Sequence, residues 1–207
     1  MNKIIVAGCG TGVGKTIVSA ILVHALKGEY WKPIQCGTGV DSDSLTMKLL
    51  LPDHQIYPSA YNLKAPLSPH HAAKLEKKVI KTSIIIPPST ERPLIIESVG
   101  GIFVPLNLME LSIDLFKDWD AVWIVVSNNY LGSINHTLLT IEALQRRNIR
   151  LHSIVFNGPQ CIETEKVILG FTKVPCLGRL SLEKNISLRT IERYSQLWKK
   201  KIVTILQ

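Results

Sequence analysis

Short apolar runs alternate along the chain with longer stretches in which apolar residues recur every three or four positions. Some runs are apolar on consecutive residues, as in VWIVV at 122–126, which is typical of strands buried on both faces of a parallel sheet. This alternation predicts an α/β fold with a mainly parallel sheet and helices on both faces. The predicted strands span residues 3–8, 31–34, 93–97, 121–127, 151–157 and 175–178.

The helical periodicity and the turn residues complete this picture. The segment 77–92 fits no single element, because Ile84-Ile85-Ile86 can extend a helix or form a short strand. No repeat or linker divides the chain, so we expect one domain over residues 1–207. The predicted helices span residues 15–27, 43–51, 69–78, 108–118, 133–147, 162–171 and 186–203.

Composition narrows the class of protein. Of 207 residues, 46% are hydrophobic and 19% are charged, which is enough to build a packed core. No apolar run approaches the ~18 residues of a membrane-spanning helix. The first residues lack the apolar segment and small-residue cleavage site of a secretory signal. We therefore expect a cytoplasmic protein without a membrane partner.

The net charge of +8 is concentrated near the end of the sequence, where residues 173–207 hold eight Lys or Arg and two Glu. Leu188, Ile191, Tyr194 and Trp198 recur through this region at helical spacing. The pattern predicts a helix that packs by its apolar side and exposes a basic side to water. We therefore expect no nucleic-acid partner; binding to nucleic acid or to a membrane surface is the alternative.

Cysteine and histidine spacing indicates no structural metal. Cys9, Cys36, Cys161 and Cys176 form no C-x-x-C pair, and the histidines are scattered. In a chain without an export signal, the cysteines are predicted to be reduced thiols.

Residues 8–16, GCGTGVGKT, lie between the first predicted strand and the first predicted helix, the context of a phosphate-binding P-loop. Glycines let successive N–H groups converge on an anion, and the helix N-terminus adds its positive dipole end. Lys15 can reach the β- and γ-phosphates, and the Thr16 hydroxyl can bind Mg²⁺. The usual G-x-x-x-x-G-K-[ST] spacing places its first glycine at Cys9, so the loop is a longer variant or Gly10 supplies part of that role.

Further polar residues follow the other predicted strands, where ligands bind in parallel sheets. Lys32 can neutralise a second anion, and Glu97 has the placement of a Walker-B-like acid. Asp41 or Asp43 can cap a helix or bind a metal, and Asn157 can recognise a purine edge or simply form a turn. An exposed lysine and a solvated glutamate are the ordinary alternatives for Lys32 and Glu97.

Taken together, these segments make the chain resemble the dethiobiotin synthetase family over nearly its full length. The family's motifs GTDTGVGKT, KPVQ[TS]G, SD, SPHxAA, EGAGGxxVPL and LGxINH are similar to residues 8–16, 32–37, 42–43, 68–73, 97–106 and 131–136.

The resemblance implies a P-loop NTPase fold and ATP- and Mg²⁺-dependent carboxylation of 7,8-diaminononanoate by CO₂, with ring closure to dethiobiotin in biotin synthesis. It implies a carbamate and then a carbamic-phosphoric anhydride as intermediates. Catalysis is assigned to Thr11, Lys15 and Lys32, and Mg²⁺ binding to Thr16, Asp43 and Glu97. The nucleotide is assigned to Gly12, Val13, Gly14, Lys15, Thr16, Asp43, Glu97, Ser98, Val99, Gly100, Asn157, Gly158, Ser181 and Leu182. The diamine is assigned to Lys32 and Cys36 and, across a homodimer interface, to Gly132, Ser133, Ile134 and Asn135.

The chain departs from the family pattern at several of these positions. Gly10 replaces an aspartate, and Cys36 replaces Ser or Thr, which are stronger hydrogen-bond donors. Ser98 and Val99 replace Gly and Ala, and Ser181 replaces a proline near the base, which leaves ATP or CTP as the nucleotide.

Two alternative functions remain at this point. One is a partitioning or regulatory P-loop ATPase that binds nucleic acid or protein, which typically carries an extra lysine where Gly10 stands. The other is a small-molecule kinase.

Overall fold

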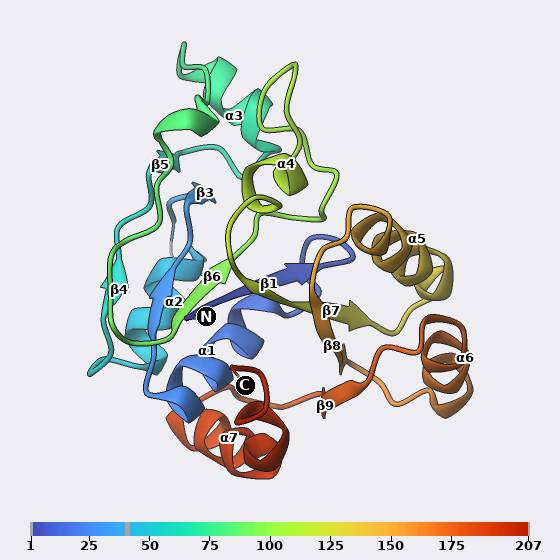
Figure 1. The fold of residues 1–207 in the computed structure, drawn as a ribbon. Helices are drawn as coiled ribbons and strands as arrows, with labels where there is room; N and C mark the ends of the chain where they lie inside the picture. Colours follow the sequence, from blue (N-terminus) through green and yellow to red (C-terminus); the bar gives the residue numbers. More distant parts are fainter. Residues whose placement is uncertain (1, 40–41, 207) are drawn as a thin grey trace.

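The computed structural model describes residues 2–39 and 42–206. It contains a seven-stranded sheet in the order β4-β2-β6-β1-β7-β8-β9, and every neighbouring pair of strands is parallel (Figure 1). The predicted parallel α/β sheet is therefore confirmed. The strands are β1 (Lys3–Gly8), β2 (Glu29–Trp31), β4 (Ile56–Tyr57), β6 (Leu94–Glu97), β7 (Val122–Asn128), β8 (Leu151–Asn157) and β9 (Cys176–Leu180).

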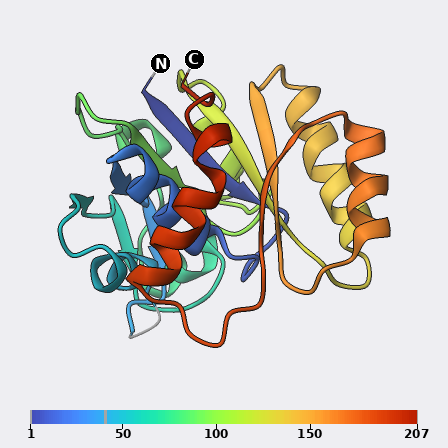
Figure 2. The ribbon, with the colours of Figure 1, turned by 90° about the horizontal axis from the view of Figure 1, so that it is seen from below.

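Helices cover both faces of the sheet, as predicted. One face packs against α1 (Lys15–Leu26), α2 (Asp43–Leu50) and α7 (Leu188–Ile202). The other face packs against α4 (Ser112–Phe116), α5 (Ser133–Gln145) and α6 (Ile162–Thr172). Figure 2 shows α7 crossing one face and α5 and α6 lying at the far side of the sheet. The short helix α3 (Pro69–Leu75) packs beyond the sheet through Ala72 and Ala73.

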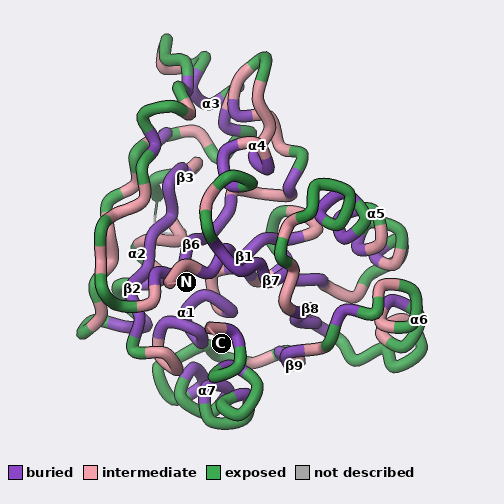
Figure 3. The backbone as a smooth tube through the Cα atoms, in the orientation of Figure 1, coloured by how far each residue is buried: buried purple, intermediate pink, exposed green. Residues whose placement is uncertain are grey.

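The central strand β1 explains why the apolar runs are continuous. Ile4 and Val6 pack in the cluster beneath α1 and α7, while Ile5 and Ala7 pack in the cluster on the opposite face. All four are completely buried, and Figure 3 shows the surrounding strands buried as well. Burial of each large apolar side chain contributes roughly 1.5–3 kcal/mol. This two-sided core fixes the carboxyl end of β1, where the P-loop begins.

The strand predicted for residues 31–34 is wrong. β2 ends at Trp31, and β3 (Ile34–Cys36) belongs to a separate two-stranded sheet with β5 (Tyr61–Leu63). Pro33 lies at the break; it has no N–H to donate to a ladder, and its carbonyl accepts a bond of 3.0 Å from the Tyr61 N–H. The break places Lys32 just beyond the end of β2.

The helix predicted for 108–118 is reduced to Ser112–Phe116. The Asn107 carboxamide oxygen accepts bonds from the N–H groups of Met109 and Glu110, which holds a turn instead of a helical start. The undecided segment 77–92 contains a single 3₁₀ turn, Thr82–Ile84, as its regular structure. β4 and β5 were not predicted, because two or three residues are too few to show a periodic pattern.

Helix α7 confirms most of the amphipathic pattern near the end of the sequence. Ile191, Tyr194 and Trp198 are buried in the cluster that includes α1, whereas Leu188 is 41% exposed. The basic residues of α7 are exposed: Arg189, Arg193, Lys199, Lys200 and Lys201. Within residues 2–39 and 42–206, no helix is both long enough and apolar enough to cross a membrane.

Candidate active site

The P-loop joins β1 to α1, and its last glycine is required by both conformation and space. Gly14 precedes α1 with φ +97°, a left-handed conformation that favours glycine. A side chain at this position would collide with the carboxamide of Asn157.

Asn157, at the end of β8, links the distant strand end to the P-loop. Its Nδ2 donates to the carbonyl of Val13 at 2.9 Å, and its Oδ1 accepts the N–H of Gly158 at 2.8 Å. The carboxamide predicted to contact the base is thus bonded to backbone groups here, and its recognition of a base stays a prediction. Ser181 and Leu182 lie near Asn157, because the N–H of Gly158 donates to the carbonyl of Leu180. Both residues are exposed.

Lys15 lies at the start of α1 and is only 6% exposed. Its Nζ donates to the carbonyl of Gly10 at 2.8 Å, so Gly10 contributes its backbone to the loop. Burial lowers the pKa of Lys15 to about 8, although the nearby Glu97 carboxylate partly opposes this shift. The ammonium is therefore close to its titration midpoint at mildly alkaline pH.

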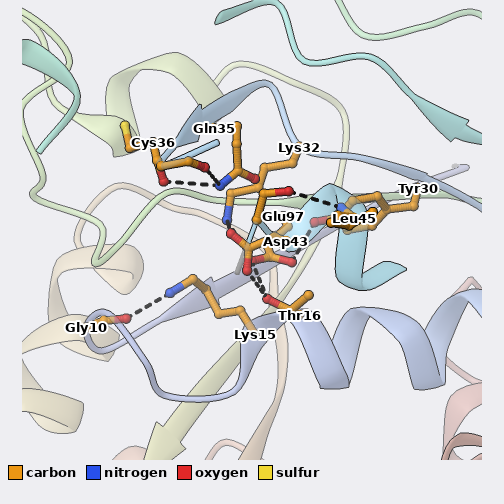
Figure 4. A network of polar contacts seen from close by, with 12 residues as sticks. Gly10, Lys15, Thr16, Tyr30, Lys32, Gln35, Cys36, Asp43, Leu45 and Glu97 are labelled. Carbon is orange, nitrogen blue, oxygen red and sulfur yellow. Dashed lines mark hydrogen bonds and ion pairs between the residues drawn. The ribbon is translucent and has the colours of Figure 1, made fainter. Parts of the chain in front are cut away.

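Thr16, Lys32, Asp43 and Glu97 converge beside the P-loop (Figure 4). Thr16 Oγ1 contacts Asp43 Oδ1 closely and lies 3.1 Å from Glu97 Oε1. Lys32 Nζ lies 2.6 Å from Asp43 Oδ2 and 2.9 Å from Glu97 Oε1. The four side chains come from α1, the end of β2, the start of α2 and the end of β6.

The fold explains this convergence. β2 and β6 are neighbours in the sheet, with Trp31 paired to Ile96, so the residues that follow this pair lie side by side. Ser42 caps α2 by accepting the N–H of Leu45, which makes Asp43 the first helical residue. Asp43 is therefore not the helix cap, and Asp41 lies outside the described residues.

The charges in this group support one another. Burial opposes the charge on Lys32, but Glu97 and Asp43 outweigh it and raise the pKa of the ammonium. Burial also opposes the charge on Asp43, and Lys32 outweighs it and lowers the pKa of that carboxyl. Lys32 is 4% exposed and Glu97 is 1% exposed, so removing Lys32 leaves the charge of Glu97 buried without its cationic partner.

The same oxygen atoms suit a hard divalent cation. Mg²⁺ is usually bound by one or two carboxylates, with water and phosphate oxygens completing its shell. Asp43, Glu97 and the Thr16 hydroxyl supply such donors, and the carboxylates already hold a cation, the Lys32 ammonium. The residues predicted to bind Mg²⁺ therefore fit that ion chemically.

A cleft of about 680 Å³ opens over this group. The predicted residues that line it are Thr11, Gly12, Gly14, Lys15, Thr16, Lys32, Cys36, Asp43, Glu97, Val99 and Gly100. Burial raises the pKa of the Cys36 thiol to about 11, so the Cys36 side chain in the cleft lining is neutral at physiological pH. The other residues of the lining received no predicted role from the sequence. Ser68, Pro69 and Val104 lie within two of the motifs quoted above. The remaining lining residues are Ile17, Thr46, Pro66 and Leu67.

Other predicted residues lie away from the cleft. The Val13 side chain is buried in the core, and Ser98, the first residue after β6, is 1% exposed. Gly132 precedes α5 with φ +99°, and residues 132–135 are not part of the cleft lining in this chain.

The sheet, the P-loop and the buried lysine at its end define the class of P-loop nucleotide-binding proteins. Residues 2–189 match a family described as an AAA domain. The septum site-determining protein MinD of Pyrococcus horikoshii, complexed with Mg-ADP, has a similar fold: TM-score 0.60 and 15% identity, covering 99% of this chain and 95% of that one. The MinC:MinD complex of Aquifex aeolicus gives TM-score 0.58 and 14% identity, covering 100% and 96%. At these identities the likeness concerns the fold alone.

Sequence relatives define the family more closely. An ATP-dependent dethiobiotin synthetase of Chlamydia pneumoniae is 46% identical over 96% of this chain and 90% of its own length. Its counterpart in Cytophaga hutchinsonii is 45% identical over 94% and 96%. The chain therefore belongs to the ATP-dependent dethiobiotin synthetase family, as the motifs indicated, and it is an enzyme of this type.

Proposed function

We propose that this enzyme carboxylates 7,8-diaminononanoate with CO₂ and closes the product to dethiobiotin, using ATP and Mg²⁺. The observation that carries the proposal is the position of Lys32, a buried ammonium beside Asp43 and Glu97 in the same cleft as Lys15. The reaction must bring together two anions, a carbamate and a triphosphate. Two cationic side chains in one cleft are suited to reduce that repulsion.

In the first step, one amine of the diamine attacks CO₂ and releases a proton to solvent, which gives a carbamate. A carbamate oxygen then attacks the γ-phosphorus, and ADP leaves. Lys15 neutralises charge on the transferred phosphoryl group, and Lys32 faces the carbamate. Thr11 lies in the cleft lining, where its hydroxyl can donate to either anion. When bound by Thr16, Asp43 and Glu97, Mg²⁺ would add charge neutralisation at the phosphate oxygens.

In the second step, the neighbouring amine attacks the carbonyl carbon of the mixed anhydride. The C–O bond to phosphate breaks, the amine releases a proton to solvent, phosphate leaves and the cyclic urea forms. Because the attack is intramolecular, holding the chain in one conformation removes much of its entropic cost. Residues 66–69, 99 and 100 line the cleft, and in the proposed reaction they would shield the anhydride from bulk water.

The proposal includes a homodimer acting in the cytoplasm, with residues 1–207 as one catalytic domain. Gly132, Ser133, Ile134 and Asn135 lie at the N-terminus of α5, outside the cleft lining of their own subunit. A helix N-terminus attracts carboxylates through its free N–H groups and dipole. This arrangement supports binding of the diamine's carboxylate by a partner subunit.

Incubation with the diamine, bicarbonate and MgATP tests the function. We expect a cyclic urea, detected by mass spectrometry, with one phosphate released per ring. A stable phosphorylated diamine would instead indicate a kinase. ATP hydrolysis that is stimulated by nucleic acid, without a urea product, would indicate a partitioning or regulatory ATPase.

Nucleotide binding is expected to take up protons at alkaline pH. The free enzyme has a Lys15 pKa of about 8, so the ammonium is mostly neutral at pH 9. A bound triphosphate favours the charged form and raises that pKa. Calorimetry in buffers of different ionisation enthalpy should show greater proton uptake at pH 9 than at pH 7. Equal uptake by Lys15→Met at pH 9 would contradict this assignment.

Replacing Cys36 with serine is expected to strengthen diamine binding. The thiol lies in the cleft lining and is a weak hydrogen-bond donor, whereas a hydroxyl of similar size donates well. A single neutral hydrogen bond contributes about 0.5–1.5 kcal/mol, so KM for the diamine should fall roughly two- to tenfold. Steady-state kinetics of Cys36→Ser and Cys36→Ala check this; equal KM values for the two variants would refute it.

A further inference from the structure

Tyr30 contacts the candidate site through the carboxylate of Glu97. It is completely buried in β2, and its hydroxyl donates to Glu97 Oε2 at 2.8 Å. Tyr30 is not part of the cleft lining, and its hydroxyl contacts the site through the bond to Glu97. Its place in Figure 4 is on the side of the acidic group away from the P-loop.

Strand geometry explains why Tyr30 and Lys32 both donate to the carboxylate of Glu97. Residues two apart on an extended strand project to the same side. β2 lies beside β6, with Tyr30 paired to Ile95, so both side chains are directed toward the end of β6. Tyr30 binds Oε2 of Glu97, and Lys32 binds Oε1. Each oxygen of this carboxylate therefore has its own donor.

We propose that Tyr30 is a positioning residue for the metal: its hydroxyl holds Glu97 so that Oε1 faces Thr16. The inference rests on the proposed function, in which Thr16, Asp43 and Glu97 bind Mg²⁺. Oε1 lies 3.1 Å from Thr16 Oγ1, while Oε2 is directed to Tyr30.

The role of Tyr30 differs from that of Lys32 once a cation arrives. Lys32 shares Oε1 with Thr16, so a metal at Oε1 competes directly with the ammonium. Tyr30 occupies the other oxygen and keeps its bond. Groups that orient metal ligands typically change metal affinity by about 10- to 100-fold.

The test is Mn²⁺ binding, measured by electron paramagnetic resonance with a non-hydrolysable ATP analogue present. Tyr30→Phe should weaken Mn²⁺ binding about tenfold. The matched control is Tyr57→Phe, because the Tyr57 hydroxyl donates to Glu29 Oε2 at 2.7 Å and neither residue lines the cleft. The control should bind Mn²⁺ as the unmodified enzyme does, and equal binding by both variants would overturn the proposal.

A second variant separates this inference from the metal assignment itself. Asp43→Asn should weaken Mn²⁺ binding if the proposed metal site is correct. If Asp43→Asn has no effect, the metal assignment fails, and the role of Tyr30 fails with it. If Asp43→Asn weakens binding and Tyr30→Phe does not, only the role of Tyr30 fails.

A measurement on intact Tyr30 covers the case in which Tyr30→Phe does not fold. The chain has five tyrosines, and biosynthetic 3-fluorotyrosine gives each a ¹⁹F resonance. Tyr→Phe changes at the other positions assign them and leave Tyr30 by difference. Adding Mg²⁺ to the nucleotide complex should shift the Tyr30 resonance and leave that of Tyr57 in place. A Tyr30 resonance that does not respond to Mg²⁺ would overturn the proposal.

Discussion

Replacing Lys32 with alanine is expected to lower turnover by about 10²–10³-fold, the usual cost of removing a preorganised group that stabilises transition-state charge. Lys32 is a buried ammonium held by Asp43 and Glu97 at the cleft wall. Without it, the carbamate approaches the triphosphate against stronger repulsion, because Lys15 is then the one cationic side chain assigned to the two anions. Nucleotide affinity should change little, because Lys15 and the P-loop remain.

The same variant should also respond more strongly to Mg²⁺. In the metal-free protein, Lys32→Ala leaves Glu97 buried without its cationic partner, which typically costs about 3–5 kcal/mol. A divalent cation can replace the lost charge, so Mg²⁺ should raise the Tm of Lys32→Ala more than that of the unmodified enzyme. The control is Lys117→Ala, which removes an exposed lysine 3.5 Å from Asp114. Near-normal turnover of Lys32→Ala would refute the assigned role.

Replacing Gly14 with alanine is expected to weaken ATP binding by more than about 100-fold, equivalent to about 2.7 kcal/mol. Gly14 has φ +97°, which alone costs an L-residue roughly 1–2 kcal/mol. The added methyl group also collides with the Asn157 carboxamide, which holds the carbonyl of Val13. The loop must move, and its N–H groups then cease to converge on the phosphates.

Titration with a fluorescent ATP analogue checks this prediction, with thermal unfolding as the measure of folding. Gly170→Ala is the control, because Gly170 lies within α6 and a Cβ there, apart from its chain neighbours and its own helix backbone, meets no atom of the described residues within 4 Å. Alanine should stabilise that helix slightly and leave binding unchanged. If Gly14→Ala binds the analogue as well as Gly170→Ala, the link between Asn157 and the P-loop is not needed for binding.

Much of the site follows from local sequence and one rule of parallel sheets. The P-loop was predictable from its strand, glycines and helix, and Glu97 from its place at the end of a strand. Lys32 was also a candidate, although the strand predicted for 31–34 contained it, and the structure places it just after β2. The neighbouring places of β2 and β6 bring Lys32 and Glu97 together. Asp43, the third residue with a carboxylate or hydroxyl proposed to bind Mg²⁺ beside Thr16 and Glu97, is the first residue of α2.

Sequence reasoning missed features that depend on the order of strands. From the sequence alone, Tyr30 is not distinguishable from an ordinary aromatic residue of the core. Its partner Glu97 is 67 residues away, on β6, which neighbours β2 in the sheet but does not follow it in the chain. The break at Pro33 was also missed, since residues 31–34 look continuous until β3 is seen to pair with β5 in a second sheet. Pairing between distant segments is not contained in local periodicity.

Transfer of an oxygen atom from CO₂ to phosphate tests the central claim most directly. In the proposed reaction a carbamate oxygen attacks the γ-phosphorus, and ring closure then breaks the bond between that oxygen and carbon. A single turnover with freshly added C¹⁸O₂ in unlabelled water, quenched before the gas exchanges oxygen, should yield phosphate carrying one ¹⁸O and a urea carbonyl carrying the other. Unlabelled phosphate would contradict the account.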